Sequence, residues 1–338
     1  MLHRLAAQLI DEVAANVLLH RYLRYRRVRP WRGPGPDRLP ELYTGELQTF
    51  FAPVPVPTDL YADRLMADRN AERTVWDVRF ASETESEWPE NDRVWCRHWQ
   101  AHTGERRLTV VGVDGIVQLG SRWFRRLAER LNPRGIDVVM MDAPCNFRRT
   151  PAGFQPGQLI ISGDLPHQLA ITRQAVLDLW RVIVSLQREG RRVGLVGVSY
   201  GGWLTLLATL VASGLDFLIA LVPPVDLVRM LRESTTIVRG IRRGLGFAPL
   251  DHGELERMAR PIIPSLWTPN LPASQIILHA ARYDRLVPCA GVERLAEQWK
   301  AHLVRHDTAH YRLALATGTT AQVAEQVLAF ERQSVPRQ

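Results

Sequence analysis

Residues 193–202, VGLVGVSYGG, place a serine between glycines directly after an apolar run. Gly197 and Gly201 stand two positions before and after Ser199, which gives the pattern G-x-S-x-G. Where a buried strand turns at once into a helix, the backbone is strained and the residues two positions away approach each other, leaving little room for a β-carbon. The pattern therefore predicts an exposed, nucleophilic serine hydroxyl; a serine that merely caps the helix is the alternative.

A serine hydroxyl is a weak nucleophile unless a base removes its proton, and the base needs a carboxylate to orient it. The apolar run 275–281 leads into RYDRLVP, which places Asp284 just beyond a strand. The run 303–306 leads into DTAHYRL, which places His310 on the next loop. We therefore predict Ser199 as nucleophile, Asp284 as orienting acid, and His310 as general base and acid.

Other residues compete for these two roles. Asp226 follows the preceding predicted strand and is the chief alternative acid. Asp307 lies too near His310 along the chain and is expected to cap a turn. The other histidines of this region fall in or before predicted strands, where packed or solvated side chains are the expected interpretation: His279, His302 and His306.

The tetrahedral oxyanion formed by acyl transfer needs backbone N–H donors. We predict one donor at Tyr200, the residue directly after the serine. The second is expected on the loop after the apolar run 108–113, where Asp114-Gly115 allows a tight turn. This makes the N–H of Ile116 the candidate donor.

GVSYGG, ARYDRLVP and TAHYRL occur in the order typical of the α/β-hydrolase superfamily, and the chain resembles that superfamily over about residues 74–335. The resemblance implies a mostly parallel central sheet with helices on both faces. It also implies the site just described: Ser199, Asp284 and His310, with an oxyanion hole from Tyr200 and Ile116. One departure concerns Asp114-Gly115, because many members carry His-Gly there. A carboxylate at that point opposes a developing oxyanion unless it points away or is paired.

The function expected on this basis is hydrolysis of a small-molecule carboxylic ester through an acyl-enzyme, with no metal or organic cofactor. The substrate is expected to be largely apolar. An acyltransferase or thioesterase would share the same three residues, and a catalytically silent scaffold fits the unusual Asp114-Gly115 loop.

The elements that must position these residues follow from the hydrophobic pattern. Residues 74–82 and 93–101 alternate apolar and polar side chains, which predicts an antiparallel edge hairpin. Continuous apolar runs predict buried strands at 108–113, 136–142, 192–198, 216–222 and 275–281, with a short strand at 303–306. Helices are expected between them, at 121–131, 165–188, from residue 200 to Gly214, at 292–299 and at 319–333. Strands that alternate with helices predict a parallel sheet covered on both faces.

Two segments lie outside this alternation. Residues 1–70 are expected to form an N-terminal amphipathic helix and a Pro-rich linker, ahead of a hydrolase domain at 71–338. Residues 223–272 are expected to form a helical cap. Arg148 and Arg149 are interpreted as solvated loop arginines, with contact to a substrate carboxylate as the alternative.

The N-terminal helix allows two interpretations. Its apolar stripe either docks on the main domain, which we favour, or lies with the arginines of residues 1–32 on an anionic membrane surface. Asp11 and Glu12 interrupt the stretch, which argues against a signal peptide. The sequence contains no run of about 20 uncharged apolar residues, so no membrane span is predicted.

The net charge of +8 comes almost wholly from arginine, since Lys300 is the only lysine. The arginines are spread along the chain without a nucleic-acid-binding motif, so we expect no nucleic-acid partner. Three separated cysteines form no CxxC pair, which argues against a zinc site or disulfide scaffold and favours a cytoplasmic protein. No sequence feature indicates an oligomeric state.

Overall fold

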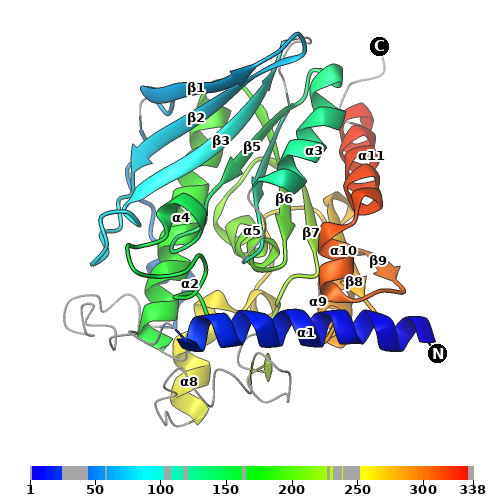
Figure 1. Cartoon of the computed structure of the whole chain (residues 1–338). Helices are drawn as coiled ribbons and strands as arrows, with labels where there is room; N and C mark the ends of the chain where they lie inside the picture. The colour runs from blue at the N-terminus through cyan, green and yellow to red at the C-terminus, as the bar shows by residue number, and fades with distance from the viewer. Residues whose placement is uncertain are drawn as a thin grey trace.

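A computed structural model describes residues 2–24, 45–57, 59–102, 108–116, 121–161, 165–226, 229–230, 238 and 252–333. In these ranges a nine-stranded sheet forms the centre of the molecule, in the order β1-β2-β3-β5-β4-β6-β7-β8-β9 (Figure 1). The strands are β1 (Asp63–Arg69), β2 (Arg73–Ala81), β3 (Arg93–Ala101), β4 (Leu108–Val113), β5 (Asp137–Met141), β6 (Arg192–Val198), β7 (Leu215–Leu221), β8 (Ile276–Ala281) and β9 (His302–His306). The pairs β1–β2, β2–β3 and β3–β5 are antiparallel. From β5 to the end of this order, each strand is parallel to its neighbour. The mostly parallel sheet and the antiparallel pairing of β2 with β3 are therefore confirmed, but β1 and not this hairpin forms the edge of the sheet.

Helices cover both faces of the sheet, as the strand–helix alternation predicts. One face packs against α3 (Arg122–Leu131), α10 (His310–Leu315) and α11 (Thr317–Gln333), and the other against α4 (Leu165–Arg188), α5 (Tyr200–Val211) and α9 (Cys289–Trp299). Neighbouring strand residues face opposite sides, so Val110 joins the core on the α3 side and Val111 the core on the α4 side. This explains why the central strands read as unbroken apolar runs.

The segment expected to be a linker takes part in the fold. Residues 63–69 form β1, which pairs with β2 at the edge of the sheet, and a short helix α2 (Leu47–Phe50) precedes it. Phe50, Phe51 and Leu60 are buried in the main core. The strand β1 was not predicted, because DRLMADR is rich in charge; all seven of its residues are exposed, as an edge strand allows. The division of the chain into an N-terminal segment at 1–70 and a hydrolase domain at 71–338 stays a prediction.

Helix α1 (Leu2–Arg24) lies across the end of the sheet where the parallel strands finish (Figure 1). It contacts α10 and the loop after β8. The helix therefore docks on the main domain, but not through its apolar stripe as we expected. The buried face carries Ala7, Asp11, Ala15 and Leu18, whereas the stripe with Leu9 and Val13 is exposed. No helix within the described ranges combines the length and apolarity needed to cross a bilayer.

The predicted cap lies partly outside the described residues. Its described C-terminal part contains α8 (His252–Ala259) and two short 3₁₀ turns, Arg260–Ile262 and Pro264–Leu266. Helix α8 packs on α4, and Trp203 of α5 donates a hydrogen bond to the carbonyl of Ile262 at 2.9 Å. This part of the segment is thus anchored on the helices of one face.

Candidate active site

Ser199 stands at the turn between β6 and α5 with a positive φ of 53° and a ψ of −119°. Such a conformation is strained for a non-glycine residue and persists only where the surroundings enforce it. A Cβ at Gly197 would lie 2.5 Å from the carbonyl oxygen of Gly201. A Cβ at Gly201 would lie 2.0 Å from the carbonyl oxygen of Val113. Both glycines are therefore required by close backbone approach, as the pattern predicts.

The structure brings the three predicted side chains together in a chain of hydrogen bonds. Nε2 of His310 lies 2.8 Å from Oγ of Ser199, and Nδ1 of His310 lies 2.7 Å from Oδ2 of Asp284. An ionised carboxylate can only accept, so Nδ1 carries the proton and Nε2 offers its lone pair to the serine O–H. The other Asp284 oxygen accepts the backbone N–H groups of Leu286 and Val287 at 2.8 and 2.7 Å. The carboxylate is thus fixed on both sides.

Burial and neighbouring charges set the pKa of the His310 imidazole. The side chains of His310 and Asp284 are 4% and 0% exposed, whereas Ser199 is partly exposed. Burial lowers the pKa of His310, but the adjacent Asp284 carboxylate and the charge of Asp11 outweigh it, so the pKa is raised above its ordinary value. The raised pKa means that the site stabilises an imidazolium, the form a general base takes after it accepts a proton.

Most of the competing residues have other hydrogen-bond partners. Asp226 accepts the backbone N–H of Arg229 at 2.8 Å, and the exposed Asp307 pairs with Arg282 at 3.1 Å. His279 is a satisfied core histidine, as expected, between Nε2 of His306 and the side chain of Gln326. Burial lowers the pKa of His279 to about 3, so this imidazole is neutral. His302 lies exposed on β9.

Known structures resemble this arrangement in fold. An acetyl xylan esterase from Thermoanaerobacterium aligns over 89% of this chain and 96% of its own, with a TM-score of 0.60 at 14% identity. A Pyrococcus horikoshii acylaminoacyl peptidase aligns over 79% of this chain and 42% of its own (TM-score 0.58, 13% identity). A Pyrococcus furiosus esterase aligns over 81% and 97% (TM-score 0.51, 18% identity). The chain has an α/β-hydrolase fold.

Sequence comparison adds a relative without a known function. An uncharacterized protein of Mycobacterium tuberculosis is 31% identical over 182 residues, which is 52% of this chain and 42% of that protein. The match thus spans less than half the length of the relative. No family model matches the chain.

The predicted oxyanion loop of this α/β-hydrolase fold lies against the serine turn, since Gly201 packs on the backbone of Val113 and Asp114. Asp114 is buried, and its Oδ1 accepts the N–H of Gly115 at 2.8 Å. Its Oδ2 has no hydrogen-bond partner among the described residues. Burial raises the pKa of Asp114 to about 7, with the Gly115 hydrogen bond opposing the shift and the charge of Asp142 adding to it. The carboxylate is therefore largely neutral below neutral pH, which weakens the expected opposition to an oxyanion.

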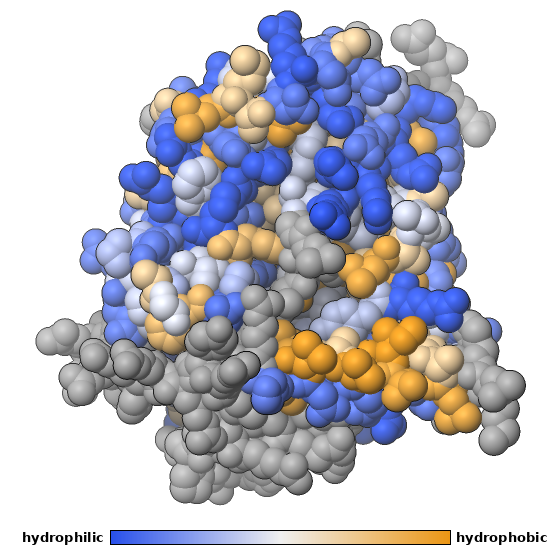
Figure 2. All heavy atoms as spheres, in the orientation of Figure 1, coloured by the Kyte–Doolittle hydropathy of each residue, from blue (hydrophilic) through white to orange (hydrophobic). Residues whose placement is uncertain are grey.

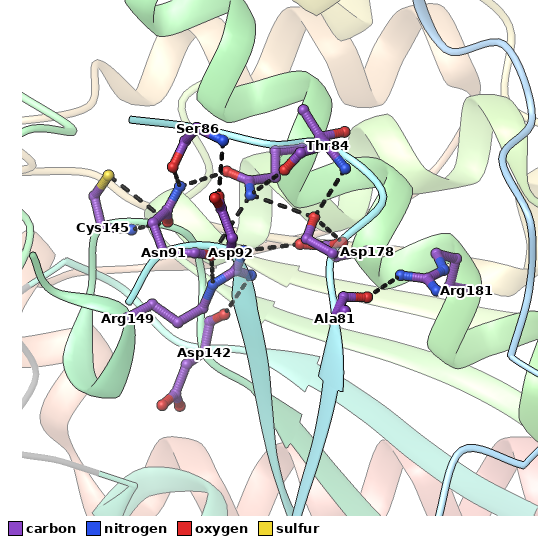
Figure 3. A network of polar contacts seen from close by, with 12 residues as sticks. Ala81, Thr84, Ser86, Asn91, Asp92, Asp142, Cys145, Arg149, Asp178 and Arg181 are labelled. Atoms are coloured by element: carbon purple, nitrogen blue, oxygen red, sulfur yellow. Dashed lines mark hydrogen bonds and ion pairs between the residues drawn. The ribbon is translucent and has the colours of Figure 1, made fainter. Parts of the chain in front are cut away.

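The interpretation of Arg148 and Arg149 as solvated loop arginines is wrong. Arg149 is 0% exposed and forms an ion pair with Asp178 at 2.9 Å, while it donates to the carbonyl of Asn91 (Figure 3). Arg148 pairs with Asp77 and Asp142, both at 2.7 Å. Both cations are neutralised by carboxylates of the fold, so neither is offered to a substrate. Their partners lie on other elements, which sequence spacing does not reveal.

A residue that was not predicted for the site also reaches this region. Asp11, on α1, is buried, and its carboxylate accepts the backbone N–H of His310 at 2.9 Å. The only available signal was an acidic residue interrupting an apolar helical stripe.

Proposed function

We propose that the protein is a serine hydrolase that cleaves carboxylic esters through an acyl-enzyme. The observation that carries the proposal is the unbroken hydrogen-bonded chain from Ser199 Oγ through His310 to Asp284, built on a strained strand–helix turn. A serine that only caps α5 needs no such chain, and Ser199 makes no side-chain capping hydrogen bond to that helix.

In the proposed reaction, Ser199 Oγ attacks the ester carbonyl carbon while Nε2 of His310 takes the hydroxyl proton. Asp284 stabilises the imidazolium formed. Collapse of the tetrahedral intermediate breaks the bond to the alcohol oxygen, which receives that proton from His310. Water then attacks the acyl-serine with His310 again as base, which releases the acid and restores the serine.

The oxyanion of both tetrahedral intermediates is assigned to the N–H groups of Tyr200 and Ile116. Support comes from the close contact of Gly201 with the loop after β4, which brings that loop beside the first turn of α5. The N–H of Gly115 is occupied by Asp114, so Ile116 is the next amide along the loop. Removing one such donor typically costs about 10²–10³ in rate.

The substrate class proposed is a small, largely apolar ester. The similar solved structures include acetyl xylan esterases and an acylaminoacyl peptidase, which agree with acyl transfer to water as the common chemistry. Ile116, on the loop after β4, packs against the main apolar core.

The test combines labelling with turnover. The purified chain is treated with a fluorophosphonate probe and assayed on p-nitrophenyl esters of increasing acyl length, alongside Ser199→Ala and the control Ser213→Ala, an exposed serine before β7. We expect labelling and hydrolysis in the wild type and the control, and neither in Ser199→Ala. An unlabelled wild type would identify a silent scaffold, and transfer to an added alcohol in preference to water would identify an acyltransferase.

A further inference from the structure

Helix α1 carries a buried acid on the face that it turns toward the catalytic edge. Asp11 is 0% exposed and shares this face with Ala7, Ala15 and Leu18. Burying a carboxylate among apolar residues is costly unless hydrogen bonds replace its lost hydration. An acid at this position therefore indicates that its contacts matter to the fold or the site.

Those contacts reach two separate loops. Oδ2 of Asp11 accepts the backbone N–H of Arg285 at 3.1 Å and that of His310 at 2.9 Å, and Oδ1 accepts the N–H of Tyr311 at 3.1 Å. Arg285 directly follows Asp284 on the loop after β8, and His310 begins α10 after β9. One carboxylate thus joins the loop that holds the acid to the loop that holds the base.

The same contacts act on the charge of the site. The N–H groups of His310 and Tyr311 lie in the first turn of α10, where no helical carbonyl is available to them. Around the Asp11 carboxylate, the titratable and charged groups are Asp284, His310, Tyr311 and the Glu12–Arg285 ion pair. Burial and the charge of Asp284 raise the pKa of Asp11, and the charge of Asp11 in turn raises the pKa of His310.

We propose that Asp11 is a positioning residue for the catalytic base: it fixes the loops of Asp284 and His310 relative to each other and supports the imidazolium. This makes α1 part of the active site. The inference rests on the proposed function for its kinetic consequences, but its effect on the imidazole is measurable without turnover.

The test compares Asp11→Asn with Glu12→Gln, the adjacent acid, whose ion pair with the Arg285 side chain is exposed. Asparagine keeps one acceptor oxygen for Arg285 and His310, but its NH₂ group then faces the N–H of Tyr311. We expect Asp11→Asn to lower kcat by about 10- to 100-fold, with a smaller change in KM. The acid limb of its pH–rate profile should move to lower pH, because the pKa of His310 falls when the Asp11 charge is lost. Glu12→Gln should stay within about twofold of wild type.

A titration separates this inference from the proposed function. The pKa of the His310 imidazole is measured by NMR on ¹⁵N-histidine-labelled wild type and both variants. A lower pKa in Asp11→Asn alone supports the positioning role even if no ester is hydrolysed. Unchanged imidazole titration and kcat in Asp11→Asn, or equal changes in Glu12→Gln, would overturn it.

A wild-type measurement keeps the inference testable if Asp11→Asn does not fold. The backbone amide resonances of Arg285, His310 and Tyr311 should shift together on acidification, with one midpoint above the ordinary carboxyl range. Independent or absent shifts of these amides contradict a shared acceptor.

The opposite face of α1 carries an independent feature. Five apolar side chains on this helix are between 44% and 63% exposed, and they form the orange patch across the helix in Figure 2: Leu5, Leu9, Ile10, Val13 and Val17. Directly after them the sequence has six arginines between residues 21 and 32, and no acidic residue occurs from 13 to 36. We propose that this apolar stripe and the basic segment dock on an anionic lipid surface, since apolar contact and positive charge are the two attractions such a surface offers.

The full chain is tested by flotation with phosphatidylcholine vesicles with and without phosphatidylglycerol. We expect binding only to the anionic vesicles, weakened by salt and reduced by about tenfold or more in Leu9→Asp with Val13→Asp. Leu65→Asp, which changes a comparably exposed residue on β1, is the matched control and should bind normally. The proposal fails if the wild type does not float, or if sedimentation shows a dimer that the Leu9→Asp and Val13→Asp changes dissociate.

Discussion

The buried acid of the loop after β4 makes the stability of the protein depend on pH in a specific direction. Burial raises the pKa of Asp114 from 3.8 to about 7. The folded protein therefore holds this proton to higher pH than the unfolded chain does. Between about pH 4 and pH 7 the unfolded chain binds fewer protons at this residue, so the free energy of unfolding falls as pH rises. Replacing Asp114 with asparagine removes this contribution.

The size of the effect follows from the two pKa values. A shift of about three units corresponds to about 4 kcal/mol once the residue is fully ionised. Between about pH 5 and about pH 8, the titration of Asp114 lowers the free energy of unfolding of the wild type by roughly 2–3 kcal/mol. We therefore expect the free energy of unfolding of Asp114→Asn, relative to wild type, to be higher by that amount at about pH 8 than at about pH 5. The corresponding change in the difference between the urea midpoints is about 1 M.

The assay is urea unfolding of both proteins at the two pH values, followed by circular dichroism. Only the difference between the proteins is used, because carboxyl groups that do not interact with Asp114 contribute equally to both curves. Asp307→Asn, at an exposed ion pair, is the control and should differ little from wild type at either pH. Equal midpoint differences for Asp114→Asn at the two pH values would refute a raised pKa at this residue.

Three further outcomes are expected. Asp284→Asn should lower kcat by about 10⁴, measured on the best p-nitrophenyl ester, because an amide can donate to Nδ1 and leave the proton on Nε2 of the base. Gly201→Ala should lower the free energy of unfolding in urea by about 3 kcal/mol or more, because its Cβ would lie 2.0 Å from a backbone oxygen. The control Gly318→Ala has open space around it and should be neutral or slightly stabilising. Arg149→Met should cost about 3–5 kcal/mol in the same assay by leaving Asp178 buried without its cation, and a double variant with Asp178→Leu should recover part of that loss.

The turn at Ser199 could be predicted because its cause is local. A strand that passes at once into a helix brings residues four positions apart into contact. Glycine is needed at both positions, so Gly197 and Gly201 make the turn visible in the sequence. The strands before Asp284 and His310 were equally readable, since burial on both faces leaves an unbroken apolar run. Parallel strands end at one edge, so the order of the three residues was enough to expect them together.

Other features depend on partners that no local pattern specifies. Arg149 reads as one more loop arginine until Asp178, on α4, is packed against it. The charged segment of β1 becomes a strand only because β2 offers it an unpaired edge.

The sequence by itself determined the strand–helix alternation, the serine turn and the candidate acid and base, because each depends on backbone periodicity or on residues close in the chain. Tertiary structure alone decided that Asp11 meets the N–H of His310, 299 positions away. The reason is physical: a carboxylate pairs with whichever donor folding brings within reach, and that choice is made by the packing of α1 across the end of the sheet.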